Sequence, residues 1–240
     1  MADRRPAFYA ATGPAGDWWT LLHPPYTAWH LSYVAIGAAL APHLDAERLV
    51  ATLLAFFLAV GIAAHALDEL NGRPLRTSIP SPVLAGSAMA ALTGAVVIGV
   101  VGTTRVGLVL VPFVVVGAFL VAAYNLELLG GRFHTDAAFA AAWGAFPVLT
   151  AYVAQAERLT LPALAAAVAA YLISRAQRSL SSSVRFVRRQ TRSVDITLEL
   201  QDGSTRAGHE ELLLDPPEAA LHALSWGLPL LAAALVAARL

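Results

Sequence analysis

Residues 83–102 read VLAGSAMAALTGAVVIGVVG, twenty residues without one charged side chain. A helix of about 20 apolar residues is what spans the hydrocarbon core of a bilayer. Working outward from this run, six further apolar segments cover 25–42, 48–67, 106–128, 137–155, 160–178 and 219–239. Because backbone groups in lipid must be satisfied within the chain, each segment is predicted to be a helix. The predicted fold class is an all-α polytopic membrane protein with about seven transmembrane helices.

The composition agrees with a membrane protein. The 240 residues are 58% hydrophobic and only 13% charged, whereas about a quarter of the residues in a soluble domain are charged. The sixteen acidic and sixteen basic residues cancel, which argues against nucleic acid as a partner. Every basic residue is an arginine and there is no cysteine. These absences exclude disulfides, cysteine metal ligands, thiol nucleophiles and a catalytic lysine.

The chain divides into four predicted parts. These are a polar N-terminal segment (1–20), a six-helix membrane bundle (21–178), an Arg-rich cytoplasmic connection (179–218) and a seventh transmembrane helix (219–240). Residues 194–200 alternate like a strand and run into a Gln-Asp-Gly turn at 201–203, which predicts a hairpin. Asp215 before Pro216 and Pro217 predicts the N-cap and first turn of the last helix.

The arginines predict the orientation. Twelve of the sixteen fall in the N-terminal segment and in the connections on its side of the membrane. By the positive-inside rule this side is cytoplasmic, so the protein is predicted to be integral to the cell membrane with its N-terminus inside and its C-terminus outside. Six of the seven histidines fall on the same side.

The first apolar segment carries a polar stripe. His23, Tyr26, His30, Tyr33 and Gly37 recur at helical spacing, and such a stripe is expected to face the bundle interior because polar groups are costly against lipid. For His23 and Tyr26, near the membrane boundary, an interfacial position is an equal alternative.

The second segment ends in a cluster of ionisable residues. His65, Asp68 and Glu69 are spaced i, i+3 and i+4, so they are predicted to point to one side and to hold a divalent cation. Arg73 and Arg76 follow in a proline-containing loop, where they are predicted to bind an anion such as a phosphate. The alternative is a helix end that simply reaches water.

The fourth and sixth segments also end in polar residues. Tyr124 and Glu127 are predicted to share a helical face, and Gly130 and Gly131 to let His134 and Asp136 fold back over the site. In the sixth segment Arg175, Arg178, Arg185 and Arg189 lie on roughly one face. They predict either a helix that snorkels towards anionic headgroups or a phosphate clamp.

These motifs resemble the UbiA superfamily of intramembrane prenyltransferases over about residues 20–155. His65 and Asp68 stand at acidic positions of the family's first signature, and Arg73-Pro74-Leu75 with Ile79-Pro80-Ser81 is similar to the loop that follows it. Tyr124-Asn125 and the stretch 143–149 are similar as well. The family's second Asp-rich motif has no carboxylate counterpart at 175–183. The resemblance implies a UbiA-like bundle with a cytoplasmic-side active site.

Two enzymatic functions are therefore expected. The first is prenyl transfer or related isoprenoid diphosphate chemistry on a membrane lipid or isoprenoid substrate, with a divalent metal such as Mg²⁺. The second is a His/carboxylate iron, zinc or manganese enzyme that oxidises or hydrolyses a lipid or quinone. A non-enzymatic lipid- or metal-binding subunit is a third alternative.

The residues expected to serve these functions fall into three overlapping sets. The catalytic set is Asp68, Glu69, Glu127 and Tyr124; the substrate-binding set is Arg73, Arg76, Asn125, Arg178, Tyr26 and Trp143; and the metal-binding set is His30, His65, Asp68, Glu69, Glu127 and His134.

Overall fold

A computed structural model describes residues 10–11 and 13–240. It is helical apart from one two-stranded hairpin, which confirms the predicted all-α class. Arg4 and Arg5, which contribute to the predicted orientation, lie outside the described residues.

The longest connection between elements of the described chain is the ten-residue loop 71–80. In chain order the elements are α1 (Gly13–Leu21), α2 (Pro24–Ala39), α3 (Ala46–Phe56), η1 (Phe57–Ala64), α4 (His65–Leu70), α5 (Ser81–Val106), η2 (Leu108–Leu110), α6 (Val111–Asn125), α7 (Leu128–Gly131), α8 (Asp136–Ala140), η3 (Ala141–Ala145), α9 (Phe146–Ala156), α10 (Leu161–Gln190), β1 (Ile196–Glu199), β2 (Thr205–Gly208) and α11 (Glu211–Ala237). Here η1 and η3 are π-helical and η2 is a 3₁₀ turn.

Five helical stretches of the described chain are long and apolar enough to cross a membrane: Ala46–Leu70, Ser81–Val106, Leu108–Asn125, Asp136–Ala156 and Glu211–Ala237. They support a membrane protein. α2, with 16 residues, and α10 pack in the same bundle but are not among the five, so the count of seven spans stays a prediction.

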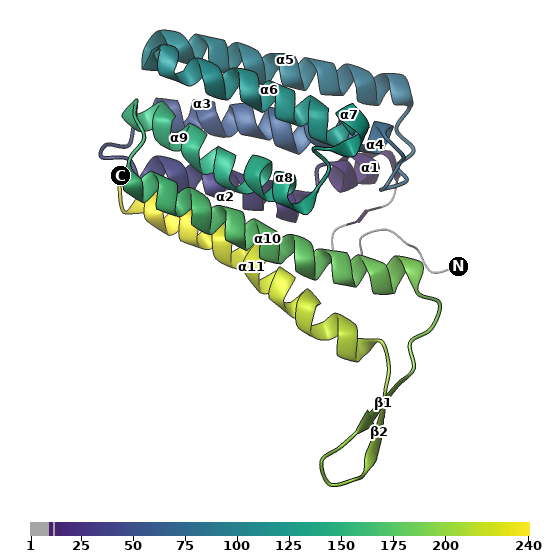
Figure 1. Cartoon of the computed structure of the whole chain (residues 1–240). Coiled ribbons are helices and arrows are strands. Elements are labelled where there is room, and N and C mark those ends of the chain that lie inside the picture. Colours follow the sequence, from purple (N-terminus) through teal and green to yellow (C-terminus); the bar gives the residue numbers. More distant parts are fainter. Residues whose placement is uncertain (1–9, 12) are drawn as a thin grey trace.

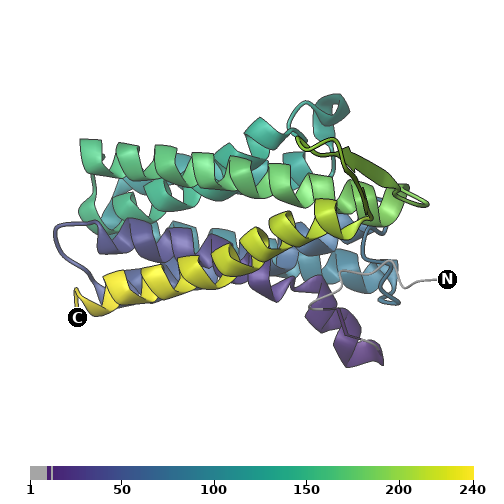
Figure 2. The ribbon, with the colours of Figure 1, turned by 90° about the horizontal axis from the view of Figure 1, so that it is seen from below.

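The bundle is layered. In Figure 1, α5 and α6 lie along one side, α3 and α9 lie in the middle, and α10 and α11 lie along the opposite side. α2 is central because it packs against both α9 and α11. Figure 2 shows α11 crossing the bundle obliquely beside α2 and α10.

The connections separate between the two ends of the bundle as the sequence predicts. At the end that holds the C-terminus, Arg48 donates to the carbonyls of Arg105 and Ala154 and pairs with Glu157 at 3.0 Å. Arg239 donates to the carbonyls of Ala41 and Pro42 at the same end. The hairpin and α7 lie at the other end (Figure 1). Which end faces the cytoplasm stays a prediction.

The connection between α10 and α11 contains the predicted hairpin. β1 and β2 pair antiparallel, with Ile196 opposite Gly208 and Glu199 opposite Thr205. In the turn, Ser204 donates its backbone N–H to Asp202 Oδ1 at 2.9 Å. The predicted strand and turn are therefore confirmed.

The predicted start of the last helix is wrong. α11 begins at Glu211, and Pro216 and Pro217 lie inside it, so Asp215 is not its N-cap. The four residues before Asp215, Glu-Leu-Leu-Leu, are good helix formers and add one turn ahead of the prolines.

Two glycines allow helices to touch backbone to backbone. A Cβ atom at Gly37 on α2 would lie 2.3 Å from the carbonyl oxygen of Val148 on α9. A Cβ atom at Gly144 in η3 would lie 2.7 Å from the carbonyl oxygen of Ala170 on α10. These contacts hold α9 and α10 against the core, and side chains at either glycine would push the helices apart.

We expect Gly37→Ala to lower the melting temperature of the purified protein by several degrees, because overpacking costs about 1–3 kcal/mol. Gly86→Ala is the matched control, since a Cβ atom at Gly86 in α5 meets nothing within 4 Å. This control should leave the melting temperature unchanged or raise it. Equal melting temperatures for the two variants would contradict the predicted close packing.

Candidate functional site

A buried carboxylate organises the loop between α4 and α5. Glu69 is completely buried. Its Oε2 accepts the backbone N–H of Leu75 at 2.9 Å, and its Oε1 accepts the backbone N–H and the hydroxyl of Thr77 at 2.8 and 2.9 Å. Three hydrogen bonds satisfy the carboxyl group at a position that solvent does not reach. Glu69 therefore holds this loop, and both of its oxygens are engaged.

The same loop is held by two further side chains. Asp17 of α1 is buried and accepts the backbone N–H of Ser78 at 2.7 Å. Arg73 folds back along its own loop, donating to the carbonyl of Ile79 at 2.7 Å and to Ser81 Oγ at 2.6 Å. The Arg73 guanidinium is thus bound within the loop, whereas Arg76 lies on the exposed surface.

The predicted convergence of His65, Asp68 and Glu69 on one side is wrong. The His65 ring lies 4.7 Å from that of His23. The Asp68 carboxylate interacts electrostatically with His134, Glu69 and Arg178, whereas both oxygens of Glu69 are bonded to the loop. Among residues 10–11 and 13–240, no three His, Asp or Glu side chains are grouped to hold one metal ion. The donor set does not fit a metal shared by Asp68 and Glu69.

Two π-helical segments place the histidines. His30 Nδ1 lies 2.9 Å from the carbonyl oxygen of Trp143 in η3, and His65 Nδ1 lies 3.1 Å from that of Gly61 in η1. A π-helical turn displaces carbonyls from the regular ladder, and here an imidazole N–H satisfies one in each segment. Because a carbonyl only accepts, Nδ1 carries the proton in both rings and Nε2 is left as an acceptor.

Glu127 is not on the face predicted for it. α6 ends at Asn125, Glu127 has a left-handed backbone (φ 50°), and its side chain is 53% exposed. Helical spacing from Tyr124 therefore does not apply. His134 does fold back as predicted, because its ring stacks on Tyr124 at 4.6 Å and its Nδ1 lies 3.2 Å from the Tyr124 carbonyl oxygen.

α10 brings two arginines over these groups. Arg178 pairs with Asp136 at 3.0 Å and lies 4.9 Å from the centre of the Phe139 ring. Arg185, two turns further, interacts electrostatically with Tyr26 and Tyr124. Its guanidinium donates to Ser182 Oγ at 3.0 Å and forms no ion pair with a carboxylate in the described part of the chain.

These residues form one connected group, which we call the polar cluster. It consists of His23, Tyr26, His65, Asp68, Tyr124, His134, Arg178 and Arg185. It lies at the end of the bundle opposite the C-terminus. Burial of Arg185 and the nearby Arg178 lower the pKa of the Arg185 guanidinium. Asp136 and Asp68 lie beside Arg178, whereas Arg185 has no ion-pairing carboxylate among the described residues, and such a guanidinium pair suits an anionic ligand.

The remaining predicted residues lie around the cluster. Asn125 is buried and donates to the carbonyl of Val121 at 2.8 Å. Trp143 is buried, with its ring edge-on to Tyr124 at 5.9 Å. Two neighbours, Arg185 and Gln177, are missing from the predicted site sets. Gln177 is a polar neighbour of the Tyr26 hydroxyl. The i, i+7 spacing of Arg178 and Arg185 places both on one helical face, and this spacing could have added Arg185 to the predicted site.

Comparisons with protein-family models, with curated proteins and with solved structures find no match for this chain.

We expect Glu69→Ala to destabilise the protein by about 3 kcal/mol or more, because buried N–H groups of Leu75 and Thr77 lose their acceptor. Asp68→Ala is the control, because the Asp68 side chain faces the polar cluster rather than the loop. It should leave the melting temperature nearly unchanged. If the two variants melt alike, Glu69 does not hold the loop.

His23 predicts a pH dependence of stability. Burial, His65 and the arginines of α10 lower the pKa of His23 well below its usual 6.5. The unfolded chain therefore takes up a proton near pH 6.5 that the folded chain refuses, so the free energy of unfolding falls as the pH drops from about 8 to about 5.

The variant His23→Asn should lose part of this pH dependence, since Asn accepts the left-handed backbone of His23 (φ 46°). His209→Asn, at an exposed position, serves as the control and should melt like the parent protein at each pH. Parallel melting curves for His23→Asn and the parent would argue against a buried neutral imidazole.

Proposed function

We propose that this chain is an integral membrane protein that binds an isoprenoid phosphate or diphosphate through the polar cluster and acts on it by prenyl transfer or related chemistry. The observation that carries the proposal is the pair Arg178 and Arg185, which face Tyr26 and Tyr124 at one end of an apolar bundle. The guanidinium groups suit the phosphate oxygens, and the surrounding helices suit the hydrocarbon tail.

The chemistry follows from the charges. In the ionisation of an allylic diphosphate the carbon–oxygen bond breaks, and the electron pair leaves with the diphosphate. A nucleophilic atom of the acceptor would then form the new bond to the allylic cation and lose a proton to solvent or to the released diphosphate. Arg178 and Arg185 would neutralise the negative charge that develops on this leaving group. Tyr26 and Tyr124 supply hydroxyl donors beside them. The resemblance to the UbiA superfamily favours the same reaction class.

A divalent metal is implied by that resemblance, but the donor set does not support it. Both oxygens of Glu69 are hydrogen-bonded to the loop between α4 and α5. Of the two neighbouring carboxylates, only Asp68 belongs to the polar cluster. Binding of a metal ion together with the diphosphate stays a prediction that metal analysis tests.

One observation favours a transition-metal enzyme as a second candidate. His30, His65 and His134 each place Nδ1 within hydrogen-bonding distance of a backbone carbonyl oxygen. A histidine that ligates a metal through Nε2 commonly has this arrangement. Within the described chain the three rings are not grouped around one point, so this candidate requires the cluster to rearrange on binding.

The direct test measures the binding of farnesyl diphosphate to the purified protein through the change in its melting temperature. We expect farnesyl diphosphate to raise the melting temperature, and farnesol to have a much smaller effect. Arg185→Gln should weaken binding about tenfold or more, since a hydrogen bond to a charged group contributes about 1.5–3 kcal/mol. Arg175→Gln, exposed on the same helix, should bind like the parent.

Other outcomes separate the alternatives. Equal stabilisation by farnesol and farnesyl diphosphate would contradict an anion site. Stoichiometric iron, zinc or manganese in the purified protein, lost in His65→Ala, would support the second candidate instead. Binding of farnesyl diphosphate without release of diphosphate, with membrane lipids supplied as acceptors and with and without added Mg²⁺, would indicate a lipid-binding subunit rather than an enzyme.

A further inference from the structure

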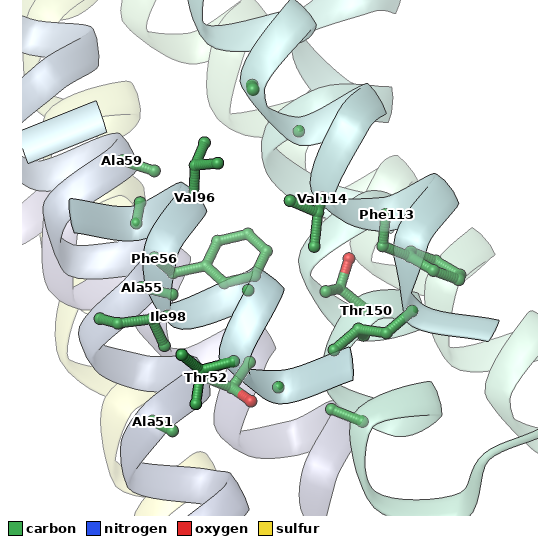
Figure 3. Close-up of a pocket in the computed structure, with 18 of the residues that line it drawn as sticks. Ala51, Thr52, Ala55, Phe56, Ala59, Val96, Ile98, Phe113, Val114 and Thr150 are labelled. Atoms are coloured by element: carbon green, nitrogen blue, oxygen red, sulfur yellow. The ribbon is translucent and has the colours of Figure 1, made fainter. Parts of the chain in front are cut away.

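In addition to the polar cluster, the bundle contains an apolar cavity. A cavity of about 610 Å³ runs between α3, α5, α6 and α9. Asp45, Glu47, Arg48 and Arg105 stand at one end of it, on the C-terminal side of the bundle. Val121 and Trp143 line its inner part. Figure 3 shows side chains of α3, α5 and α6 together with Thr150 of α9 around this space.

We propose that this cavity binds one hydrocarbon chain of a zwitterionic phospholipid such as phosphatidylethanolamine, whose headgroup contacts Glu47 and Arg105. The inner wall of this site includes Trp143, whose ring lies against Tyr124 of the polar cluster, but the proposal does not depend on the function proposed for the cluster.

The wall of the cavity suits hydrocarbon. Thr52 and Thr150 are hydroxyl-bearing residues of the wall, and each donates to a carbonyl of its own helix, of Arg48 at 2.7 Å and of Phe146 at 2.8 Å. These hydroxyl protons are therefore already used. A quinone or sterol oxygen would gain no donor from either hydroxyl, whereas a methylene chain needs none.

Small side chains create the space. Ala51 and Ala55 of α3 and Ala59 of η1 line the cavity. Gly99 and Gly102 of α5 line it as well. The helical stretch from Asp45 to Val60 rises roughly 20 Å at the helical pitch. One leaflet contributes about half of the ~30 Å hydrocarbon core, so the cavity is deep enough for a single acyl chain.

The rim suits a headgroup that carries both charges. Arg48 is saturated by Glu157 and by carbonyls, and Asp45 Oδ1 accepts the backbone N–H of Arg48. Arg105 and Glu47 form a weak pair at 3.6 Å, with 68% and 80% of their side chains exposed. A phosphate beside Arg105 and an ammonium beside Glu47 would complement both charges.

The test uses the full chain, purified in detergent, incubated with dioleoyl phosphatidylethanolamine and examined by native mass spectrometry. We expect one lipid to remain bound. Ala55→Phe fills the cavity and should lower the occupancy at least fivefold. Val50→Phe is the matched control, because Val50 lies on the same helix with 63% of its side chain exposed, and it should bind lipid like the parent.

The headgroup is tested by variants at the exposed rim, which leave the core packing intact. Glu47→Gln with Arg105→Gln should weaken binding about threefold, a typical effect for an exposed charge pair. Full occupancy in Ala55→Phe, checked for folding by its helical circular dichroism, would overturn the proposed cavity site. Equal retention of dioleoyl phosphatidylglycerol by the parent, or no effect of the rim variants, would overturn the headgroup assignment.

Discussion

The buried carboxylate of Glu69 is the constraint on which the polar end of this bundle depends. A polar group that solvent does not reach is tolerated only when hydrogen bonds replace its hydration, and Leu75 and Thr77 provide three. These bonds fix where the chain turns after α4 and therefore where α5 begins. Because they occupy Glu69, Asp68 alone of this neighbouring pair is left to face the polar cluster.

The π-helical segments have a comparable effect on the histidines. η1 and η3 each offer a displaced carbonyl to an imidazole, so the rings of His65 and His30 are fixed by the backbone itself. Gly144 lies in η3 and lets α10 approach closely. The position of α10 in turn decides how far Arg178 and Arg185 reach over the cluster. Local widening of two helices thus sets the geometry of the whole site.

Features that repeat with helical or strand spacing could be predicted from the sequence. The surroundings of side chains next to a turn or a helix end could not. Five of the seven apolar runs, the hairpin and the buried part of the stripe at His30, Tyr33 and Gly37 follow from spacing alone, and the structure confirms them. Glu69 and Glu127 were misplaced because their surroundings depend on how the chain turns beyond each helix. Glu69 bonds a loop six to eight residues later, and Glu127 lies beyond a helix end that no spacing marks.

The two ends of the bundle differ in how their arginine side chains are paired, and this difference points to the polar cluster as the functional site. At the C-terminal end Arg48 meets Glu157 and several carbonyls, and Arg239 meets two carbonyls. Outside the bundle, Arg188 pairs with Glu218, whose carboxylate raises the pKa of Arg188. Arg185 lies inside the polar cluster with Ser182 as its hydrogen-bonded neighbour. Among the described residues no carboxylate forms an ion pair with Arg185, and an anionic ligand would supply the missing negative charge. The apolar cavity offers no comparable charge imbalance, so a lipid chain bound there would support the fold rather than take part in the chemistry.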